Sequence, residues 1–489
     1  MYLEYLFPSQ RLNNSLKGIN IKDVYQDSRL VKKGCLFFII ERESFDIYSC
    51  LRNLEAKVSV FVAARQAKKK VNCLINKKPV IFVKDVEKEL RRVSDILYRH
   101  SRNTFKFIGV TGTNGKTTVA FIIYEVLKSM DKDVSLLGTV KHCLGSKEQR
   151  AVNTTPGFLD LRKMLVRVQE EGSEFVVMEV SSHALSQRRI EGIDFEKCVF
   201  TNLSREHLDY HKTMRDYFLA KQRLFFGHKN KAAIVNADDY YGRKLISRLP
   251  AVITYGVNRE SEYRAKNLKL GPWGSSFSLV AGGKVYPVTT CLYGKHNIYN
   301  ILAAVAALAS LGFPLPGIIS AVASFKPVDG RLQKICDNIF IDYAHTPDAI
   351  KKAILALKQS GYNEIICLFG CGGGRDKGKR RAMGAEACAL ADFSFITSDN
   401  PRNENPEDIC RQIVAGFSKN NYILIIDRKK AIEEAISRLR KNDKKDKNLS
   451  GRCLLICGKG HEEFQIIGER KIPFKDSRVV KSLVKESVT

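Results

Sequence analysis

The sequence predicts an α/β protein with parallel sheets that are covered by helices on both faces. Strand-like apolar runs alternate with helical patterns over residues 105–326, and the alternation resumes over residues 335–489. The length of 489 residues exceeds what one hydrophobic core usually organises and suggests about three domains. We therefore expect domains over residues 1–102, 103–328 and 329–489.

The first region predicts a small α/β unit. Short apolar runs at 35–40, 58–62 and 79–83 have the length of strands, and a helical pattern covers 86–102. The polar cluster 26–29, Gln-Asp-Ser-Arg, precedes the first strong strand and by its residues alone predicts an ordinary capping turn.

The middle region predicts a parallel sheet followed by a β extension. The expected strands are 105–111, 133–139, 174–180, 197–202 and 231–236, and the expected helices are 116–130, 157–171 and 213–227. An alternating, glycine-rich stretch over 255–288 predicts further strands, and an alanine-rich helix follows over 294–312.

The last region predicts a second sheet of the same kind. Its expected strands are 339–343, 364–370, 393–397, 422–426 and 452–457, and its expected helices are 347–360, 379–391, 406–418 and 428–441. Ligands collect at the carboxyl ends of strands in open α/β sheets. Here those ends carry the polar motifs Asp342-Tyr-Ala-His345, Gly370-Cys-Gly-Gly-Gly-Arg-Asp376, Asp399-Asn-Pro-Arg402 and Gly458-Lys-Gly-His-Glu462.

The stretch 107–118 predicts a nucleoside triphosphate site. A hydrophobic strand runs into a turn with Gly112 and Gly115 and then into a helix. Glycines let backbone N–H groups approach phosphate oxygens at the positive end of the helix, Lys116 adds a cation, and Thr117 offers a hydroxyl to Mg²⁺. An ordinary glycine-bearing turn between a strand and a helix is the alternative.

Two further side chains extend this predicted site. Glu179 ends a buried strand, where a hard oxygen ligand for Mg²⁺ would lie, and His207 follows the next strand. A lone glutamate or histidine is more often structural. Because both stand at strand ends beside the glycine turn, we favour a role in an ATP and metal site.

Composition argues against nucleic acid and membrane partners. The formal net charge is +29, yet the basic runs, such as 67–70 and 441–447, are short and lie where loops are expected. No apolar run approaches the ~20 residues that span a bilayer. We expect a cytoplasmic protein whose 13 cysteines, none in a CxxC pair, are reduced core thiols.

Eleven motifs in order resemble the Mur ligases, the ATP-dependent amide-forming enzymes of peptidoglycan precursor synthesis. They are DSR, GVTGTNGKTT, NTTPG, MEVSSHALSQRR, FTNLSREHLDYH, AKQRLF, GKHNIYN, DYAHTPDA, GCGGGRDKGKR, DNPR and GKGHE. The resemblance is closest to the branch that adds meso-diaminopimelate to UDP-N-acetylmuramoyl-L-alanyl-D-glutamate. It implies a UDP-binding domain, a central P-loop ATPase domain and a C-terminal Rossmann-like domain that closes over the site.

The resemblance also implies roles for matching residues. ATP would contact Gly112, Thr113, Asn114, Gly115, Lys116, Thr117, Thr118, Asn297 and Arg331. The magnesium sites would use Thr117, Glu179, His207 and Lys221, with Lys221 carbamylated by CO₂. Catalysis would involve Lys116, Glu179, His207, Lys221, Asp342 and His345, the last two near the domain junction.

Two substrate sites are implied in the same way. UDP-muramoyl-dipeptide would lie along Ser28, Asn153, Thr154, Thr155, Ser181, Gln187 and Arg189. The incoming meso-diaminopimelate would contact Arg375, Asp399, Asn400, Pro401, Arg402, Gly458 and Glu462. The expected partners are thus these two substrates, ATP and Mg²⁺, and we expect a monomer.

The chain departs from the family pattern at two places. Glu206 stands where the family usually has aspartate, and residues 41–47 replace a glycine-containing segment that helps to bind the uracil end. The alternatives within the superfamily are a lysine-adding Mur ligase and a folylpolyglutamate-type ligase. A nucleic-acid-dependent P-loop ATPase and a nucleotide-regulated scaffold are the alternatives from other classes.

Overall fold

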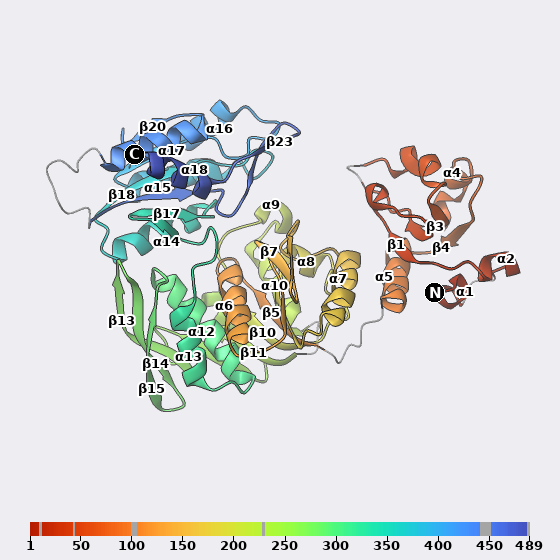
Figure 1. Cartoon of the computed structure of the whole chain (residues 1–489), viewed down its shortest axis with the longest axis horizontal. Coiled ribbons are helices and arrows are strands. Elements are labelled where there is room, and N and C mark those ends of the chain that lie inside the picture. The colour runs from red at the N-terminus through yellow and green to blue at the C-terminus, as the bar shows by residue number, and fades with distance from the viewer. Residues whose placement is uncertain (9–11, 43–44, 99–104, 227–229, 441–450, 487–489) are drawn as a thin grey trace. The chain divides into compact units, whose positions relative to one another are not determined.

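The computed structural model describes residues 1–489 except 9–11, 43–44, 99–104, 227–229, 441–450 and 487–489 (Figure 1). Contacts divide the chain into two compact units. The first comprises Met1–Thr104, Pro156–Gly172 and Arg188–Glu191, and the second comprises Phe105–Thr155, Ser173–Gln187 and Gly192–Thr489. The division into three domains stays a prediction.

The first unit contains a parallel sheet with the strand order β1-β2-β3-β4. Its strands are β1 (Asp23–Tyr25), β2 (Cys35–Phe38), β3 (Val58–Ala64) and β4 (Val80–Val83). Successive residues of β2 face two different cores, because side chains alternate along a strand: Leu36 and Phe38 pack on one face, Cys35 and Phe37 on the other.

Two longer helices complete this unit. Helix α5 (Val86–Leu97) begins at Asp85, whose carboxylate accepts the backbone N–H of Lys88 at 2.9 Å. Helix α7 (Phe158–Glu170) contributes Leu159 to the same core and belongs to this unit. The short helices are α1 (Leu3–Leu6), α2 (Asn14–Lys17), η1 (Ser28–Leu30), η2 (Ile47–Cys50), α3 (Leu51–Leu54), η3 (Arg65–Ala67) and α4 (Lys68–Asn72).

The second unit begins with an 11-stranded sheet of order β15-β14-β13-β12-β11-β10-β5-β9-β6-β7-β8. The strands from β13 to β6 are parallel, and antiparallel hairpins extend both edges. The strands are β5 (Lys106–Thr111), β6 (Val134–Leu137), β7 (Lys141–Leu144), β8 (Lys147–Arg150), β9 (Phe175–Glu179), β10 (Phe195–Phe200), β11 (Asn230–Asn236), β12 (Val252–Gly256), β13 (Tyr263–Gly271), β14 (Gly274–Ala281) and β15 (Lys284–Thr290). The predicted parallel centre is confirmed, whereas the polar hairpin β7–β8 was not predicted.

Three helices share one face of this sheet. Helices α6 (Lys116–Ser129), α12 (Lys295–Ser310) and α13 (Leu315–Ser324) pack against one another, and their buried residues form one core with the strands (Figure 1). Alanines on α12 let the helices approach closely. The other helices of this part are α8 (Ser182–Ser186), α9 (Leu208–His211), α10 (Met214–Phe226) and α11 (Tyr240–Ile246).

A second sheet follows, with strand order β16-β17-β21-β18-β19-β20. Only the pairing of β16 with β17 is antiparallel among its described strands. The elements are β16 (Gln333–Cys336), β17 (Ile339–Asp342), α14 (Pro347–Gln359), β18 (Glu364–Phe369), α15 (Lys379–Leu390), β19 (Phe393–Ile396), α16 (Pro406–Val414), β20 (Tyr422–Leu424), α17 (Arg428–Arg440), β21 (Arg452–Cys457), the hairpin β22 (Phe464–Ile467) and β23 (Arg470–Pro473), and α18 (Asp476–Glu486).

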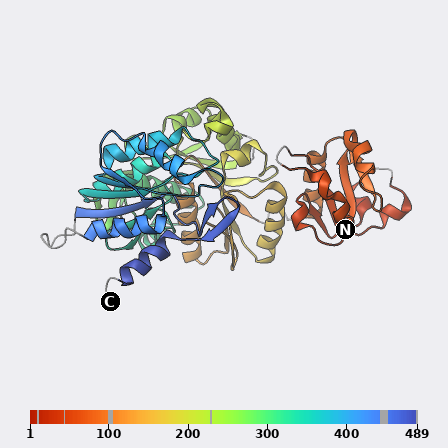
Figure 2. The same ribbon diagram turned by 90° about the horizontal axis from the view of Figure 1, so that it is seen from above.

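Helices lie on both faces of this sheet, as Figure 2 shows. Alternation along β18 sends Cys367 and Phe369 into the core shared with α14, α15 and α16, and Ile366 and Leu368 into the core shared with α17 and α18. The predicted doubly covered sheet is therefore confirmed. The predicted helix ends at 99–102, 227 and 441 lie outside the described residues. No helix in the described part of the chain is both long and apolar enough to cross a membrane.

A buried ion pair joins the helices α17 and α18 to the strand ends. Arg428 bonds both carboxylate oxygens of Asp476 at 2.8 Å, and both side chains are 0% exposed. The same guanidinium donates to the carbonyls of Cys457 at 2.9 Å and Ser398 at 3.4 Å. These carbonyls immediately precede the motifs 399–402 and 458–462, so the pair fixes where both motifs leave the sheet.

Removal of this arginine should destabilise the sheet strongly. In Arg428→Met, Asp476 keeps a buried charge without its partner, and we expect the opening free energy of the β21 amides to fall by about 3–5 kcal/mol. Arg411→Met is the control, because Arg411 is 70% exposed and its ion pairs are exposed too, so about 0–1 kcal/mol should be lost. Native-state hydrogen exchange measures both changes, and equal losses would contradict the structural role of the buried pair.

Candidate functional site

The loop between β5 and α6 requires glycine at two positions. Gly112 has φ 146° and Gly115 has φ 89°, which L side chains rarely adopt. A Cβ atom on Gly112 would lie 1.9 Å from Thr201 Oγ1, and one on Gly115 would lie 2.3 Å from Asn300 Oδ1. The loop therefore packs too closely for side chains at these two positions, and it leads directly into the N-terminus of α6, as a phosphate cradle requires.

Two lysine side chains converge on this loop. Lys116 Nζ donates to the carbonyls of Gly112 at 2.9 Å and Thr113 at 2.7 Å, and Lys221 Nζ donates to the same Gly112 carbonyl at 2.8 Å. Burial lowers the pKa of Lys116, although Glu206 and Glu179 oppose that change. Burial and the neighbouring Lys116 ammonium lower the pKa of Lys221 well below its usual value, with Glu206 again opposing.

Glu179 connects the helix start to the next strand of the sheet. Its Oε2 accepts the hydroxyls of Thr117 at 2.8 Å and Thr139 at 3.0 Å, and its Oε1 accepts the Thr139 N–H at 2.7 Å. Arg331 Nη2 donates to the Thr117 hydroxyl at 3.1 Å, while its Nε is buried without a hydrogen-bond partner in the described part of the chain. The structure thus brings together three of the predicted nucleotide and metal residues.

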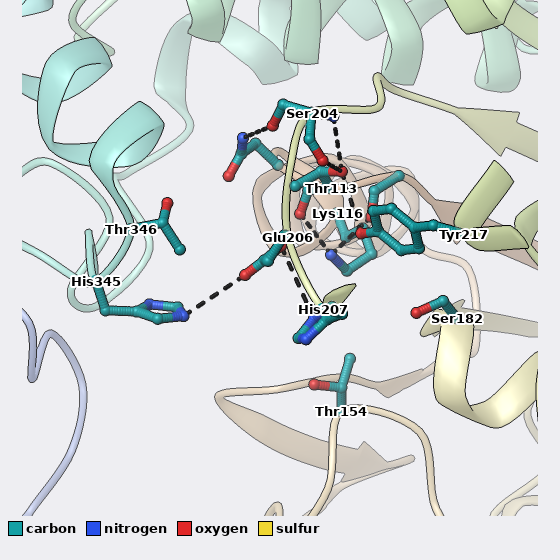
Figure 3. A network of polar contacts seen from close by, with 12 residues as sticks. Thr113, Lys116, Thr154, Ser182, Ser204, Glu206, His207, Tyr217, His345 and Thr346 are labelled. Atoms are coloured by element: carbon teal, nitrogen blue, oxygen red, sulfur yellow. Dashed lines mark hydrogen bonds and ion pairs between the residues drawn. The ribbon is translucent and has the colours of Figure 1, made fainter. Parts of the chain in front are cut away.

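A second carboxylate, Glu206, lies between two histidines (Figure 3). Its Oε2 is 3.8 Å from His207 Nε2 and its Oε1 is 3.7 Å from His345 Nε2, and its side chain is 16% exposed. Burial raises the pKa of this carboxyl, but His207, His345, Lys116 and Lys221 together hold it below the usual value. Desolvation lowers the pKa of both histidines despite the nearby carboxylate.

The same region is tied to the start of α14. Asp348 Oδ2 accepts the Asn114 side-chain amide at 3.0 Å and the Ser204 hydroxyl at 3.0 Å. The Ser204 backbone N–H donates to Thr113 Oγ1 at 3.0 Å, so this residue contacts both the phosphate loop and Asp348. Sequence reasoning missed Asp348 and Ser204, because neither belongs to a pattern that indicates their pairing.

Two other predicted residues support loops rather than contact the phosphate cradle directly. Asp342 accepts the backbone N–H groups of Leu332 at 2.6 Å and Ala344 at 2.7 Å, and burial raises its pKa. Asn297 is buried on α12, where its amide donates to the Tyr293 carbonyl at 2.9 Å. Both contacts fix the backbone that leads into the site.

The residues predicted for the muramoyl substrate fall in both units. In the second unit, Thr155 Oγ1 donates to the Glu179 carbonyl at 2.7 Å and accepts the Ser181 N–H at 3.0 Å. Thr154 Oγ1 lies 3.1 Å from the Thr139 hydroxyl oxygen, which places this segment beside Glu179. Asn153 and Gln187 are exposed members of that unit, whereas Ser28 and Arg189 belong to the first unit.

The residues predicted for the amino acid gather at the strand ends of the second sheet. Asn400 Nδ2 donates to Glu462 Oε2 at 2.7 Å, and Arg402 Nη1 donates to the Gly373 carbonyl at 2.6 Å. A Cβ atom on Gly458 would lie 2.5 Å from the buried carboxylate of Asp399. Pro401 is buried, and Arg375 is exposed on the glycine-rich loop.

The site contains residues that sequence reasoning did not single out. Thr139 bonds Glu179 through both its hydroxyl and its backbone, and the Tyr217 hydroxyl lies 3.1 Å from Thr113 Oγ1 (Figure 3). Lys459 bonds both Asn400 and Glu462. The position of Lys459 between two glycines at a strand end was the one available signal. No group of three or more histidine, cysteine, aspartate or glutamate side chains in the described residues is arranged to hold a metal.

These observations indicate a nucleotide-dependent enzyme with a phosphate loop and a cluster of polar residues at the strand ends of a neighbouring sheet. Comparison with known protein families gives the same class. Residues 110–308 match the family described as "Mur ligase middle domain", and residues 330–460 match the family described as "Mur ligase, glutamate ligase domain". The chain is 36% identical over 477 residues, with 96% of each chain covered, to UDP-N-acetylmuramoyl-L-alanyl-D-glutamate–2,6-diaminopimelate ligase 1 of Clostridium acetobutylicum. It is 38% identical, with 94% of each chain covered, to the corresponding ligase of Geobacillus thermodenitrificans. The chain belongs to the Mur ligase family and is an ATP-dependent ligase.

Solved structures agree with this assignment. A structure of a UDP-N-acetylmuramoyl-L-alanyl-D-glutamate–2,6-diaminopimelate ligase superposes with a TM-score of 0.66 at 28% identity and covers 100% of this chain and 99% of its own. The MurF ligase of Thermotoga maritima in complex with ADP gives a TM-score of 0.65 at 18% identity, with 95% and 98% covered. The second likeness supports the fold alone.

Removal of the loop lysine should abolish ligation without unfolding the protein. We expect Lys116→Ala to lower kcat by at least about 100-fold, because the cation predicted to neutralise phosphate in the transition state would be lost. Lys128→Ala is the control, since Lys128 is exposed at the far end of α6 and should leave kcat unchanged. Phosphate release measures the rates, and circular dichroism checks folding. An active Lys116→Ala enzyme would exclude this lysine from the mechanism.

Proposed function

We propose that this enzyme adds meso-diaminopimelate to the D-glutamate of UDP-N-acetylmuramoyl-L-alanyl-D-glutamate. The observation that carries the proposal is the polar pocket formed by 399–402 and 458–462, which combines a guanidinium with carboxylates. The curated relatives over nearly the whole chain are named as 2,6-diaminopimelate ligases, and this supports the same assignment. ATP is the co-substrate, and ADP and phosphate are the products.

The reaction requires activation of a carboxylate. Amide formation from a carboxylate and an amine in water is uphill, so a carboxylate oxygen of the D-glutamate side chain attacks the γ-phosphorus of ATP and ADP leaves. The neutral amine then attacks the acyl carbon of this acyl phosphate, phosphate leaves with its electron pair, and the nitrogen releases one proton to solvent. Such phosphoryl transfer depends mainly on positioning and charge neutralisation.

The residues near the phosphate loop suit the first step. Lys116 and the N–H groups at the N-terminus of α6 would neutralise the phosphate while a second anion approaches. The hydroxyl of Thr117 and the carboxylate of Glu179 lie 2.8 Å apart and are hard oxygen donors of the kind that Mg²⁺ prefers, so they would hold this ion together with His207. When bound, Mg²⁺ would supply charge neutralisation for the phosphoryl group.

Lys221 fits a carbamate better than an ammonium. It is 1% exposed, it shares the Gly112 carbonyl with Lys116, and its pKa is lowered well below the usual value by burial and by Lys116. A neutral amine in that position can react with CO₂. The carbamate would carry a negative charge into a pocket that otherwise holds two cations, and it would help to orient the metal.

The amino-acid pocket offers partners for the charges of meso-diaminopimelate. The distal carboxylate would pair with Arg402, whose Nε and Nη2 have no hydrogen-bond partner among the described residues, and Arg375 would bring a second cation. The neighbouring ammonium would pair with Asp399 and Glu462. Glu462 Oε1 likewise has no partner in the described part of the protein, so it can accept this ammonium.

The proposed muramoyl-dipeptide site and the proposed domain arrangement rest on the similarity to the Mur ligases. The muramoyl-dipeptide would lie along Ser28, Arg189 and the segment from Asn153 to Thr155, together with Ser181 and Gln187. His345 and Asp342 would complete the site where the central and C-terminal domains meet. We propose a cytoplasmic monomer of three domains, over 1–102, 103–328 and 329–489, in which closure of the last domain excludes water from the acyl phosphate.

A comparison of amino acids tests the proposed substrate. We expect meso-diaminopimelate to be used with a kcat/KM at least about 100-fold above that of L-lysine, because lysine leaves the Arg402 guanidinium unpaired, and such sites can discriminate by up to about 10⁴–10⁵. Arg402→Ala should lose most activity with meso-diaminopimelate. The exposed control Arg411→Ala should not.

The panel also includes L-lysine and L-glutamate as sole amino-acid substrates, with phosphate release as the readout. Preference for L-lysine would indicate a lysine-adding ligase, and use of glutamate with a folate acceptor would indicate a folylpolyglutamate-type ligase. Full activity of Arg402→Ala with meso-diaminopimelate would remove this arginine from the pocket.

A further inference from the structure

Lys459 is a completely buried cation in the second sheet's strand-end pocket. It follows β21, its residue is 0% exposed, and its ammonium has three acceptors. Nζ lies 3.1 Å from Asn400 Oδ1, 3.2 Å from Glu462 Oε2 and 2.7 Å from the Phe464 carbonyl. An ammonium has three N–H groups, so each can serve one of these acceptors and none remains to bind a ligand.

The contact with Asn400 fixes the orientation of its amide. Oδ1 accepts from Lys459 and also from the backbone N–H of Ile466 at 3.0 Å. Because both of these groups are donors, the side of the Asn400 amide that faces them must carry the oxygen. An NH₂ group there would offer them no acceptor. Nδ2 must therefore point the other way, where it donates to Glu462 Oε2 at 2.7 Å.

The same ammonium also holds one of the two carboxylate oxygens of Glu462. Oε2 accepts from both Asn400 and Lys459, whereas Oε1 has no hydrogen-bond partner among the described residues. A carboxylate held in this way presents one oxygen in a set direction. That oxygen suits an ammonium group of the incoming amino acid.

The third contact orders the hairpin that supports Arg402. Lys459 bonds the carbonyl of Phe464, where β22 begins, and Arg402 forms a parallel β-bridge with Ile467 of β22. The Arg402 N–H donates to the Ile466 carbonyl at 3.0 Å, and its carbonyl accepts the Gly468 N–H at 2.7 Å. One buried ammonium thus connects the acidic and the basic sides of the pocket.

We propose that Lys459 is a positioning residue that determines how tightly the amino-acid substrate is bound. It would act through Asn400, Glu462 and the β22 backbone without touching the substrate itself. A methionine has nearly the same length and would pack in the same space, and buried charges are often no more stabilising than apolar residues of similar volume. The inference rests on the proposed function, because it assigns the pocket to the incoming amino acid.

The test is the kinetics of Lys459→Met. We expect the KM for meso-diaminopimelate to rise about 10- to 100-fold, the range for loss of hydrogen bonds to charged groups. The KM values for ATP and for the muramoyl-dipeptide should change by less than about twofold, since those sites are built from other residues. A purely structural lysine would instead lower the amount of active enzyme and leave all three KM values alone.

Lys475→Met is the matched control. This lysine is also largely buried, with 17% of its side chain exposed, and pairs with Asp329 at 2.8 Å and Glu463 at 3.8 Å, which are not pocket residues. Lys475→Met therefore removes an ammonium group from the C-terminal part of the chain, as Lys459→Met does. All three KM values should stay near those of the parent enzyme, and a matching rise in the amino-acid KM would overturn the specific role of Lys459.

A second variant keeps the proposal testable if Lys459→Met does not fold. Lys459→Arg retains the charge, but a planar guanidinium cannot reach the same three acceptors in the same geometry, so the amino-acid KM should still rise about tenfold. Parental KM in either folded variant would overturn the proposal. In the Glu462→Gln background, Lys459→Met should raise the amino-acid KM by a smaller factor than in the parent enzyme, because both changes act on one contact. Fully additive effects of the two substitutions would contradict the proposal.

These outcomes differ from failure of the proposed function. If the parent uses another amino acid in place of meso-diaminopimelate, the proposed substrate is wrong, but the KM for that amino acid should still rise in Lys459→Met. If the parent uses meso-diaminopimelate and its KM is unchanged in the folded variants, the inference about Lys459 alone is wrong.

Discussion

The backbone carbonyl of Gly112 accepts hydrogen bonds from two lysine ammonium groups, and the rest of the site is organised around that concentration of positive charge. Lys116 comes from the helix that starts at the loop, and Lys221 comes from α10, more than a hundred residues later. Two like charges at one buried acceptor repel each other. Glu206 offsets this repulsion at both lysines and Glu179 does so at Lys116; Glu179 ends β9 and Glu206 lies in the loop after β10, the two strands that flank β5.

The C-terminal sheet uses buried cations in a related way. Arg428 holds the ends of two strands through carbonyl oxygens, and Arg380, 0% exposed, joins the glycine-rich loop to Glu404 at 2.9 Å. Lys459 then orients the polar groups of the pocket. Each of these three cations is paired with an acidic side chain. The polar groups around them are therefore already oriented before a ligand binds, and binding requires little reorganisation of the pocket.

Much of this fold could be predicted from local sequence. The strand and helix that flank the phosphate loop show clear periodicity, and Gly112 and Gly115 indicated the turn because no other residue fits there. The hairpin β7–β8 was missed because Lys147–Arg150 is polar throughout and has no apolar alternation. Pairings such as Asp348 with Asn114, or Lys459 with Asn400, could not be predicted, since they depend on how distant segments pack and no local pattern encodes them.

The proposed carbamate on Lys221 is the feature that distinguishes this site most directly, because burial and the neighbouring Lys116 favour a neutral Lys221 amine that can react with CO₂. The direct measurement is ¹³C NMR of the enzyme equilibrated with ¹³C-labelled bicarbonate, compared with Lys221→Met. A carbamate carbonyl resonance present in the parent and lost in the variant is the predicted result. Identical spectra of the two proteins, with the parent fully active, would contradict the claim.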